Sequence, residues 1–189
     1  YEYIDFATNS AHHPSPDYGF IIPYTVTANT AIELRFSCHQ YVDMIRVGSD
    51  SDSAAINIDY NSGSNMRVTY GGTTTGELSS YKDNTDTTVK FDKNVLYINN
   101  NLVNTFSQLS TTYSNIYIKC DEYGDSVNIA KLWYLKVWED EVLMLNLIPM
   151  LYNDSNVLYD TVNNQAYSYE SGNGSISLIN NLGDYYIYV

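Results

Sequence analysis

Apolar and polar residues alternate along much of this chain. Between residues 31 and 38, isoleucine, leucine, phenylalanine and cysteine take every second position, with Glu33 and Arg35 among the residues between them. A period of two places one set of side chains on a buried face of a strand and the other set on an exposed face. This stretch therefore predicts a β-strand with one side in the core.

Similar stretches recur at intervals of roughly 8 to 12 residues, which is typical of a β-sandwich. Clusters of Gly, Ser, Asn and Asp, such as 48–53 and 61–65, separate them. We expect the main strands at 3–6, 18–22, 31–36, 42–47, 55–60, 66–70, 89–91, 95–98, 101–103, 116–120, 157–160, 165–167 and 184–189. The polar stretch 71–88 is expected to be a long surface connection, and Asn99 to Asn101 a tight hairpin turn. No window has a helical period.

The most specific pattern lies between residues 129 and 176. Two alternating strands surround the acidic turn 139–141, the pair Ile148 and Pro149 follows, and a second hairpin is joined by Asn163 and Asn164. This order resembles the closing segment of concanavalin A-like (laminin G-like) sandwich domains, which are common in phage tail proteins and in surface proteins of gut bacteria. The matching positions are Trp133, Leu135, Lys136, Val137, Trp138, Leu147, Ile148, Pro149, Leu158, Tyr159, Asp160, Asn164, Tyr167 and Gly172.

The resemblance implies a fold and a setting. The fold is an all-β, concanavalin A-like jelly-roll sandwich of two antiparallel sheets with about a dozen strands. We expect one domain over residues 1–189, because sandwiches often reach this length around a single core. The setting is a virion tail, or the extracellular space or a cell surface.

Charge narrows the choice of partners. The chain has 9 basic and 22 acidic residues, a formal charge of −13 and a pI of about 4.3. Such a balance disfavours polyanions, such as nucleic acid, and anionic membrane surfaces as partners. No apolar run is long enough to span a membrane, and the first residues do not form a signal peptide. We therefore expect no membrane insertion and no export signal within this sequence.

Two cysteines, Cys38 and Cys120, lie in strand-like runs. A pair this sparse does not define a disulfide framework, since Cys is often a small buried residue. Two free thiols are favoured, and a bridge remains the alternative.

No cofactor is expected. The neighbouring His12 and His13 would face opposite ways on a strand and could not easily share a metal. The acidic loop with Asp50 and Asp52 leaves a structural calcium open, but it lacks the glycine and distal glutamate of an EF-hand.

The chain lacks the strings that mark catalysis. Glucanases with the related architecture carry Glu-x-Asp-x-x-Glu on one strand, and this sequence has no such string. The acidic turn 139–141 is expected to be solvated. No Gly-x-Ser-x-Gly string is present, and Cys38 and His39 would face opposite ways. We therefore expect no enzyme, with a glycoside hydrolase as the least favoured alternative.

Binding is better supported, because the chain has 20 tyrosines. Aromatic rings and nearby carboxylates can hold sugars, although most tyrosines in a sheet protein serve packing. The candidates that lie at strand ends or in loops are Tyr70, Tyr81, Tyr113, Asp121, Tyr123 and Asp125. Trp133 and Trp138 are expected in the core or on a sheet face, and Asp160 is expected to bind local backbone.

The function expected from the resemblance and the composition is non-catalytic recognition at a surface. The partner would be a host-surface glycan or a surface protein, met by a module of a phage tail or fibre. The alternative is a structural module that assembles with neighbouring subunits of a virion or surface complex, where the chain itself could form a homo-oligomer.

Overall fold

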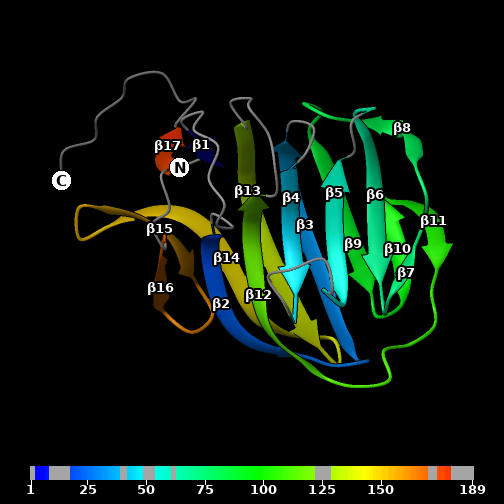
Figure 1. The fold of residues 1–189 in the computed structure, drawn as a ribbon. Helices are drawn as coiled ribbons and strands as arrows, with labels where there is room; N and C mark the ends of the chain where they lie inside the picture. Colours follow the sequence, from blue (N-terminus) through cyan, green and yellow to red (C-terminus); the bar gives the residue numbers. More distant parts are fainter. Residues whose placement is uncertain are drawn as a thin grey trace.

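The computed structural model describes residues 3–8, 18–38, 42–48, 54–60, 63–121, 129–169 and 174–179. These residues form seventeen strands and, within the described ranges, no helix (Figure 1). The strands are β1 (Tyr3–Thr8), β2 (Tyr18–Val26), β3 (Thr30–Cys38), β4 (Val42–Val47), β5 (Ile56–Tyr60), β6 (Asn65–Tyr70), β7 (Thr73–Thr74), β8 (Leu78–Lys82), β9 (Thr87–Asp92), β10 (Val95–Ile98), β11 (Asn101–Thr105), β12 (Tyr113–Asp121), β13 (Ile129–Glu139), β14 (Val142–Tyr152), β15 (Ser155–Asp160), β16 (Gln165–Ser168) and β17 (Gly174–Ile179).

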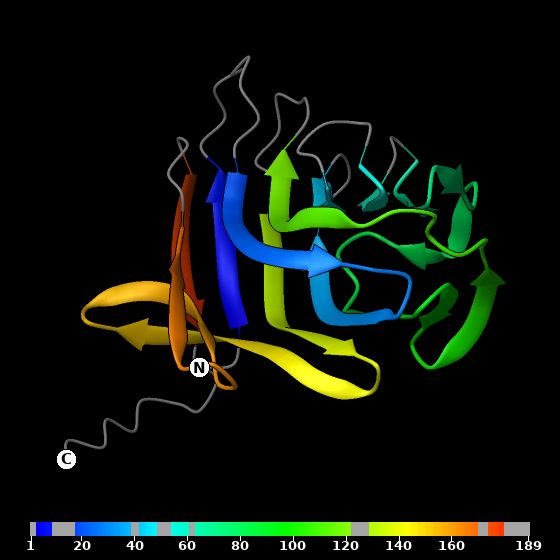
Figure 2. The same cartoon turned by 90° about the horizontal axis from the view of Figure 1, so that it is seen from below.

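The strands make two antiparallel sheets. The ten-stranded sheet has the order β11-β10-β9-β3-β13-β14-β15-β16, with β1 paired to β13 and β17 paired to β1. The seven-stranded sheet has the order β2-β12-β4-β5-β6-β7, with β8 also on β6. The sheets lie face to face (Figures 1 and 2). This confirms the predicted fold class, an all-β jelly-roll sandwich of two antiparallel sheets.

The core lies between the two sheets, and strand alternation supplies it from both sides. In β3 every second residue is buried, and Ile32, Leu34 and Phe36 have no exposed surface. In β5, Ile58 and Tyr60 are likewise buried in the same apolar cluster. Burying one such large apolar side chain contributes about 1.5–3 kcal/mol. The remaining residues of each strand must therefore form the outer surfaces of the sandwich.

Two-residue turns connect several hairpins. Asn99 and Asn100 have φ values of 49° and 65° between β10 and β11, as the sequence predicted. Asp140 and Glu141 have φ values of 46° and 70° between β13 and β14. Positive φ at both central positions gives a twist that matches the right-handed twist of the flanking strands.

The polar stretch 71–88 is more ordered than predicted, because two short strands lie within it. Gly71 and Gly72, with φ values of 56° and 78°, turn the chain back so that β7 pairs with β6. The hydroxyls of Thr69 and Thr74 then form a hydrogen bond of 2.9 Å. Strand β8 pairs with the opposite end of β6. The prediction of one long connection was therefore wrong in this region.

Other predictions concern residues or side chains that are not described. Cys38 is buried in β3, but the side chain of Cys120 is outside the described set, so the state of the two thiols stays a prediction. The expected strand 184–189 also lies outside the described residues. In the part of the chain that is described, no helix is long and apolar enough to cross a membrane.

Candidate functional site

The side chains of β9, β3 and β13 that point away from the core form one continuous surface, which we call the outer face. Lys90 of β9 lies opposite Glu33 of β3, which lies opposite Lys136 of β13. Arg35 lies opposite Tyr134 in the next row of the same face. The strand period dictates this polar surface, since each of these residues alternates with a core residue.

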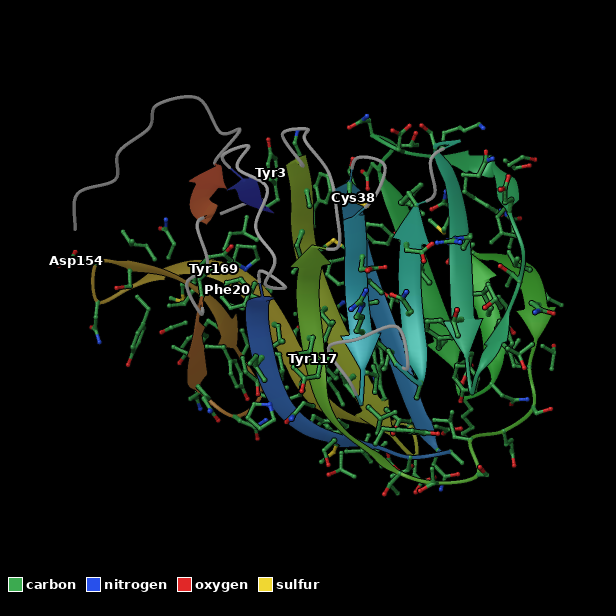
Figure 3. All side chains as sticks on the ribbon, in the orientation of Figure 1. Tyr3, Phe20, Cys38, Tyr117, Asp154 and Tyr169 are labelled. Atoms are coloured by element: carbon green, nitrogen blue, oxygen red, sulfur yellow. The ribbon has the colours of Figure 1, made fainter. Side chains whose placement is uncertain are left out.

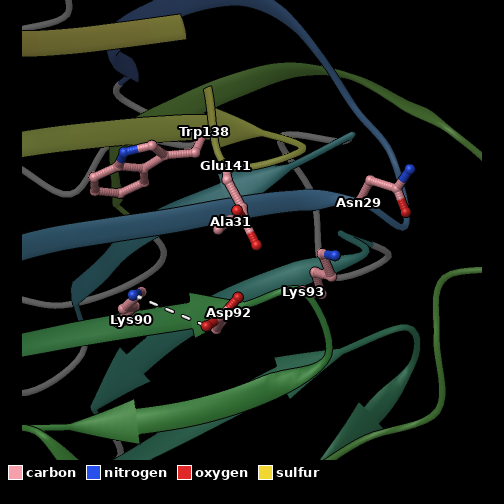
Figure 4. Close-up of a pocket in the computed structure, with 7 residues that line it drawn as sticks. All are labelled: Asn29, Ala31, Lys90, Asp92, Lys93, Trp138 and Glu141. Atoms are coloured by element: carbon pink, nitrogen blue, oxygen red, sulfur yellow. Dashed lines mark ion pairs between the residues drawn. The ribbon is translucent and has the colours of Figure 1, made fainter. Parts of the chain in front are cut away.

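A hollow of about 300 Å³ opens at one end of the outer face (Figure 4). Strands β3, β9 and β13 and three turns meet around it. Its lining residues are Asn29, Ala31, Lys90, Asp92, Lys93, Trp138 and Glu141. The small side chain of Ala31, opposite Trp138 in the sheet, leaves the space between the larger neighbours. A hollow of this size is at the lower end of the range of small-ligand sites.

The hollow combines an aromatic ring with charges of both signs. The ammonium group of Lys90 lies 4.0 Å from the carboxylate of Asp92 and 5.9 Å from the centre of the Trp138 ring. Lys93 and Glu141 come from hairpin turns, where both have positive φ. A half-buried indole can pack against the apolar face of a sugar ring, while ammonium and carboxylate groups hydrogen-bond its hydroxyls.

Cations lie over aromatic rings along the rest of the outer face. Such pairs are worth about 0.5–1 kcal/mol at exposed positions. The four pairs, with cation-to-ring distances, are Lys90 with Trp138 (5.9 Å), Lys136 with Tyr134 (4.6 Å), Arg35 with Trp133 (5.0 Å) and Lys131 with Tyr3 (5.0 Å). The outer face therefore carries a series of flat rings, each with a neighbouring positive charge.

A β-bulge brings two of these rings together. The pairing of β13 with β3 shifts between Leu132 and Tyr134, so Trp133 is the extra residue. A bulge re-aims side chains, and here Trp133 joins Tyr134 beside Arg35. The Tyr134 hydroxyl donates a hydrogen bond of 2.9 Å to Glu33 Oε1. Burial, followed by the proximity of Glu33, raises the pKa of Tyr134 to about 12, so the hydroxyl stays a donor.

Tyr70, which the sequence proposed for binding, is a core residue. Its side chain is 2% exposed and stacks on Phe91 and Phe106 with ring centres 5.5 Å and 5.3 Å apart. Burial raises its pKa to about 12. The residue does not present a ring to a ligand, and the assignment is corrected. Alternation with Met66 and Val68 was the sequence signal that could have revealed this.

Tyr81 and Tyr113 are half-buried against the core and lie apart. The register places Tyr113 at the end of the seven-stranded sheet that contains Gly48, where a Cβ on that glycine would come within 2.7 Å of the Tyr113 ring. Tyr81 lies in β8 at the opposite end, next to the start of β6. The structure therefore does not bring these two rings into one platform.

The remaining predicted site residues are only partly described. Asp121 ends β12, where its backbone pairs with Val42, but its side chain is not described. Tyr123 and Asp125 lie outside the described residues. Their role in binding stays a prediction.

Two acidic residues outside that set have clear structural partners. Glu139 was expected to be solvated, but its carboxylate accepts hydrogen bonds of 2.6 Å from each of the Thr27 and Thr30 hydroxyls. Glu139 therefore links the β2–β3 turn to β13, and the expectation that it is solvated was wrong.

Asp160 is fully buried and accepts hydrogen bonds of 3.0 Å from the backbone nitrogens of Asn146 and Val162. This confirms its predicted local role.

A second polar cluster, which the sequence did not reveal, lies on the side of the seven-stranded sheet that faces away from the apolar core, and its central ion pair is buried. Arg46 and Asp43 form an ion pair and are 1% and 5% exposed. The amide of Asn57 donates to Asp43 Oδ1 at 3.0 Å and to Asp59 Oδ2 at 3.3 Å, and Arg67 binds Asp59 through two nitrogens at 2.7 Å and 2.9 Å. Burial raises the pKa of Asp43 to about 6, against the opposing effects of Arg46 and Asn57. Each carboxylate thus already has an arginine partner.

Metal binding finds no support in the described part of the chain. There, no three His, Cys, Asp or Glu side chains lie close enough together to hold an ion. The residues considered from the sequence, His12, His13, Asp50 and Asp52, are not among the described ones. A structural calcium in that loop stays a prediction.

Comparisons with known proteins find only distant structural similarity. No family model matches the chain, and no curated protein matches it. Among solved structures, the chain is similar to a native heptameric SAP-like pentraxin from Limulus polyphemus, with 11% identity, a TM-score of 0.48, and coverage of 76% of this chain and 78% of that one. It is also similar to a sialidase, with 10% identity, a TM-score of 0.45, and coverage of 67% of this chain and 15% of that one. At TM-scores below 0.5, neither likeness extends to a ligand or an activity.

Proposed function

We propose that this chain is a non-catalytic, lectin-like domain that recognises glycans through the outer face of its ten-stranded sheet. The observation that carries the proposal is the hollow beside Trp138. An aromatic ring, two ammonium groups, two carboxylates and an amide converge there on a space suited to a sugar ring. Rigid strands and two-residue turns hold these groups, so little ordering cost is expected on binding.

The proposal includes no catalysis. Glycoside hydrolysis needs one carboxyl group whose raised pKa keeps it protonated, beside a second group that is an ionised carboxylate. In the hollow, Asp92 and Glu141 are both exposed to solvent. On the other sheet, Asp43 and Asp59 are close to one amide, but each is bound by an arginine. Neither arrangement supplies a free acid and a free base.

The setting of the proposed domain is a phage tail or fibre, or the surface of a cell. This part of the proposal rests on the resemblance of residues 129–176 to concanavalin A-like domains. Its partner would be a host-surface glycan, and a surface protein that carries such a glycan would bind equally. A short, rigid sandwich is a suitable carrier for a surface site because binding residues can vary without changing the core.

A glycan array tests the proposal, with the purified chain run with and without calcium. We expect Trp138→Ala to weaken binding about tenfold or more, equivalent to ~1.4 kcal/mol. The matched control is Tyr81→Ala, which removes a half-buried ring far from the hollow. If Tyr81→Ala abolishes binding and Trp138→Ala does not, the site is on the other sheet. If the folded chain binds no glycan, the proposal fails.

A second candidate function, assembly with neighbouring subunits, has an observation of its own. The β14–β15 hairpin projects from the sandwich, and Asp154 marks its tip in Figure 3. Three large side chains near that tip are exposed: Met150 (37%), Leu151 (44%) and Tyr152 (42%). Exposed apolar groups that lie together often mark contacts between proteins. Sedimentation velocity of wild type and Leu151→Lys tests this role, since only self-association through the hairpin would be lost in the variant.

A further inference from the structure

We infer that the outer face binds a linear acidic polysaccharide, whose carboxylate or sulfate groups pair with lysines placed beside the aromatic rings. This inference rests on the proposed function and names the ligand class of the same face. The hollow at Trp138 would hold one sugar ring of the polysaccharide. The next sugar rings of the polysaccharide would lie along β13 toward Trp133 and Tyr3.

The basic residues of the chain are unevenly distributed. The chain has nine lysines and arginines against 22 acidic residues. Five of the nine lie on the outer face or at the edge of its hollow: Arg35, Lys90, Lys93, Lys131 and Lys136. The other four are shared among the rest of the molecule. Four described carboxylates lie among them, those of Glu33, Asp86, Asp92 and Glu141. Five positive and four negative groups leave this face close to neutral, whereas the whole chain carries −13. An anionic ligand therefore meets less repulsion here than the net charge of the chain implies.

Three of these lysines form no ion pair with a described carboxylate. On the outer face, Asp86 pairs with Arg35 and Asp92 lies 4.0 Å from Lys90. Glu33 accepts a hydrogen bond from Tyr134. Across the described residues, no carboxylate comes within ion-pair distance of Lys93, Lys131 or Lys136. Among the described side chains, these ammonium groups would meet a ligand without breaking an ion pair. The backbone of Lys131 pairs with that of Asp5, whose side chain is not described.

The pairing of a ring with a cation recurs along the outer face. In each of the four pairs a cation lies over the ring, at 4.6 to 5.9 Å from its centre. A polysaccharide with anionic groups along its length likewise has apolar ring faces and charges close together. From Lys131 to Trp138 the strand spans about 23 Å at 3.3 Å per residue, which accommodates several sugar rings.

Nucleic acid also combines rings with negative charge, but it fits this face less well. Duplex DNA carries one charge for every ~1.7 Å of its axis, and a protein with a net charge of −13 repels so dense a polyanion. The carboxylates of Glu33, Asp86 and Asp92 lie among the cations of the face. A ligand with widely separated charges can place its anionic groups beside the lysines and its neutral parts beside these carboxylates.

Binding of the full chain to four immobilised polymers tests the inference. The probes are polygalacturonate for carboxylate, dextran sulfate for sulfate, dextran as the neutral polymer, and single-stranded DNA. We expect tight binding to one or both acidic polysaccharides, weakened about tenfold between 50 and 300 mM NaCl because salt screens exposed charges. The first two probes distinguish the source of the anionic group.

The decisive variant is Lys131→Gln with Lys136→Gln, which removes two charges from half-buried side chains outside the core. We expect at least a fivefold loss of affinity for the acidic polymer. The matched control is Lys82→Gln, since Lys82 lies on β8, away from the face, and donates to Asn65. An equal loss in the control, or unchanged binding in the double variant, would overturn the inference.

Three further outcomes also overturn it. These are dextran binding as tight as that of the acidic polymers, DNA binding tighter than either, and no binding to any polymer. The glycan array separates this failure from that of the proposed function. If neutral glycans bind in a Trp138-dependent manner, only the acidic ligand class is wrong. If the chain also binds no glycan on the array, both the proposed function and the acidic ligand class are wrong.

Discussion

The two sheets of this sandwich both carry charged residues on their outer surfaces, but they compensate these charges differently. On the seven-stranded sheet, Arg46 pairs with Asp43 and Arg67 pairs with Asp59. On the ten-stranded sheet, Arg35 pairs with Asp86 and Lys90 lies near Asp92, but Lys131 and Lys136 lie over aromatic rings. Charges that are satisfied within the protein hold the fold together, whereas charges left facing solvent without an acidic partner remain available to a ligand.

The comparison also separates two uses of aromatic residues. Tyr70 fills space between the sheets, and its position in the sequence near a glycine pair did not show this. Trp138 is half-buried and lines a hollow formed by residues far apart in the sequence. The first contributes to stability and the second to recognition.

Removing Arg46 should have the largest effect on stability. Arg46→Ala leaves the Asp43 carboxylate buried without its cation, which typically costs about 3–5 kcal/mol. The matched control is Arg35→Ala, because Arg35 is 40% exposed in its pair with Asp86. Exposed pairs are worth about 0–1 kcal/mol. Urea unfolding followed by fluorescence measures both, and equal losses would show that the two faces do not differ in this respect.

Truncating the buried aromatic should cost nearly as much. Tyr70→Ala removes a ring packed between Phe91 and Phe106, and a large-to-small change of this kind costs about 3–5 kcal/mol. Trp138→Ala should cost clearly less, about 1 kcal/mol, because the indole is only half-buried. Thermal unfolding of both variants provides the comparison. A larger loss for Trp138→Ala would make that residue part of the core.

The pH dependence of stability should carry a contribution from Asp43. Its pKa is raised from 3.8 to about 6 in the folded state, chiefly by burial. The folded protein therefore holds this proton more tightly, and the associated stability is present below pH 4 and lost as the pH rises through 6. We expect wild type to lose roughly 1–3 kcal/mol relative to Asp43→Asn between pH 4 and pH 7. Parallel pH profiles would contradict this.

The smallest effect on stability should come from the outer face itself. Lys136→Gln removes a charge that, within the described structure, has no acidic partner. Substitutions of this kind usually change stability by less than about 0.5 kcal/mol. Chemical unfolding measures the change, and a loss above 1 kcal/mol would assign the lysine a structural role. A variant that is stable but binds weakly would show that the charge serves the ligand.

Local pattern predicted the architecture well. The alternation around Leu34 predicted β3, and the turn preference of asparagine predicted the hairpin at Asn99 and Asn100. Both patterns involve only a few neighbouring residues, so they can be recognised from the sequence alone. The short strands β7 and β8 were not predicted, because their mostly polar and exposed residues do not alternate with a period of two.

The candidate site was much less predictable. Trp138 was expected only in the core or on a sheet face, since the hollow depends on turns at Asn29, Lys93 and Glu141 that fold together. The carboxylates of Asp43 and Asp59 meet only through the register of β4 with β5, which includes a bulge. A bulge changes which residues share a face of the sheet, and the local sequence pattern does not predict where a bulge occurs.

The most direct test uses the two tryptophans of the chain, Trp133 and Trp138. Each gives one indole N–H signal in a ¹⁵N-labelled sample, and both rings lie on the outer face. The sample would be titrated with the tightest-binding glycan found in the array or polymer experiments. We predict that both signals shift in a saturable manner, with the larger shift at Trp138. Saturable binding that leaves both indole signals unchanged would contradict the assignment of the outer face as the binding surface.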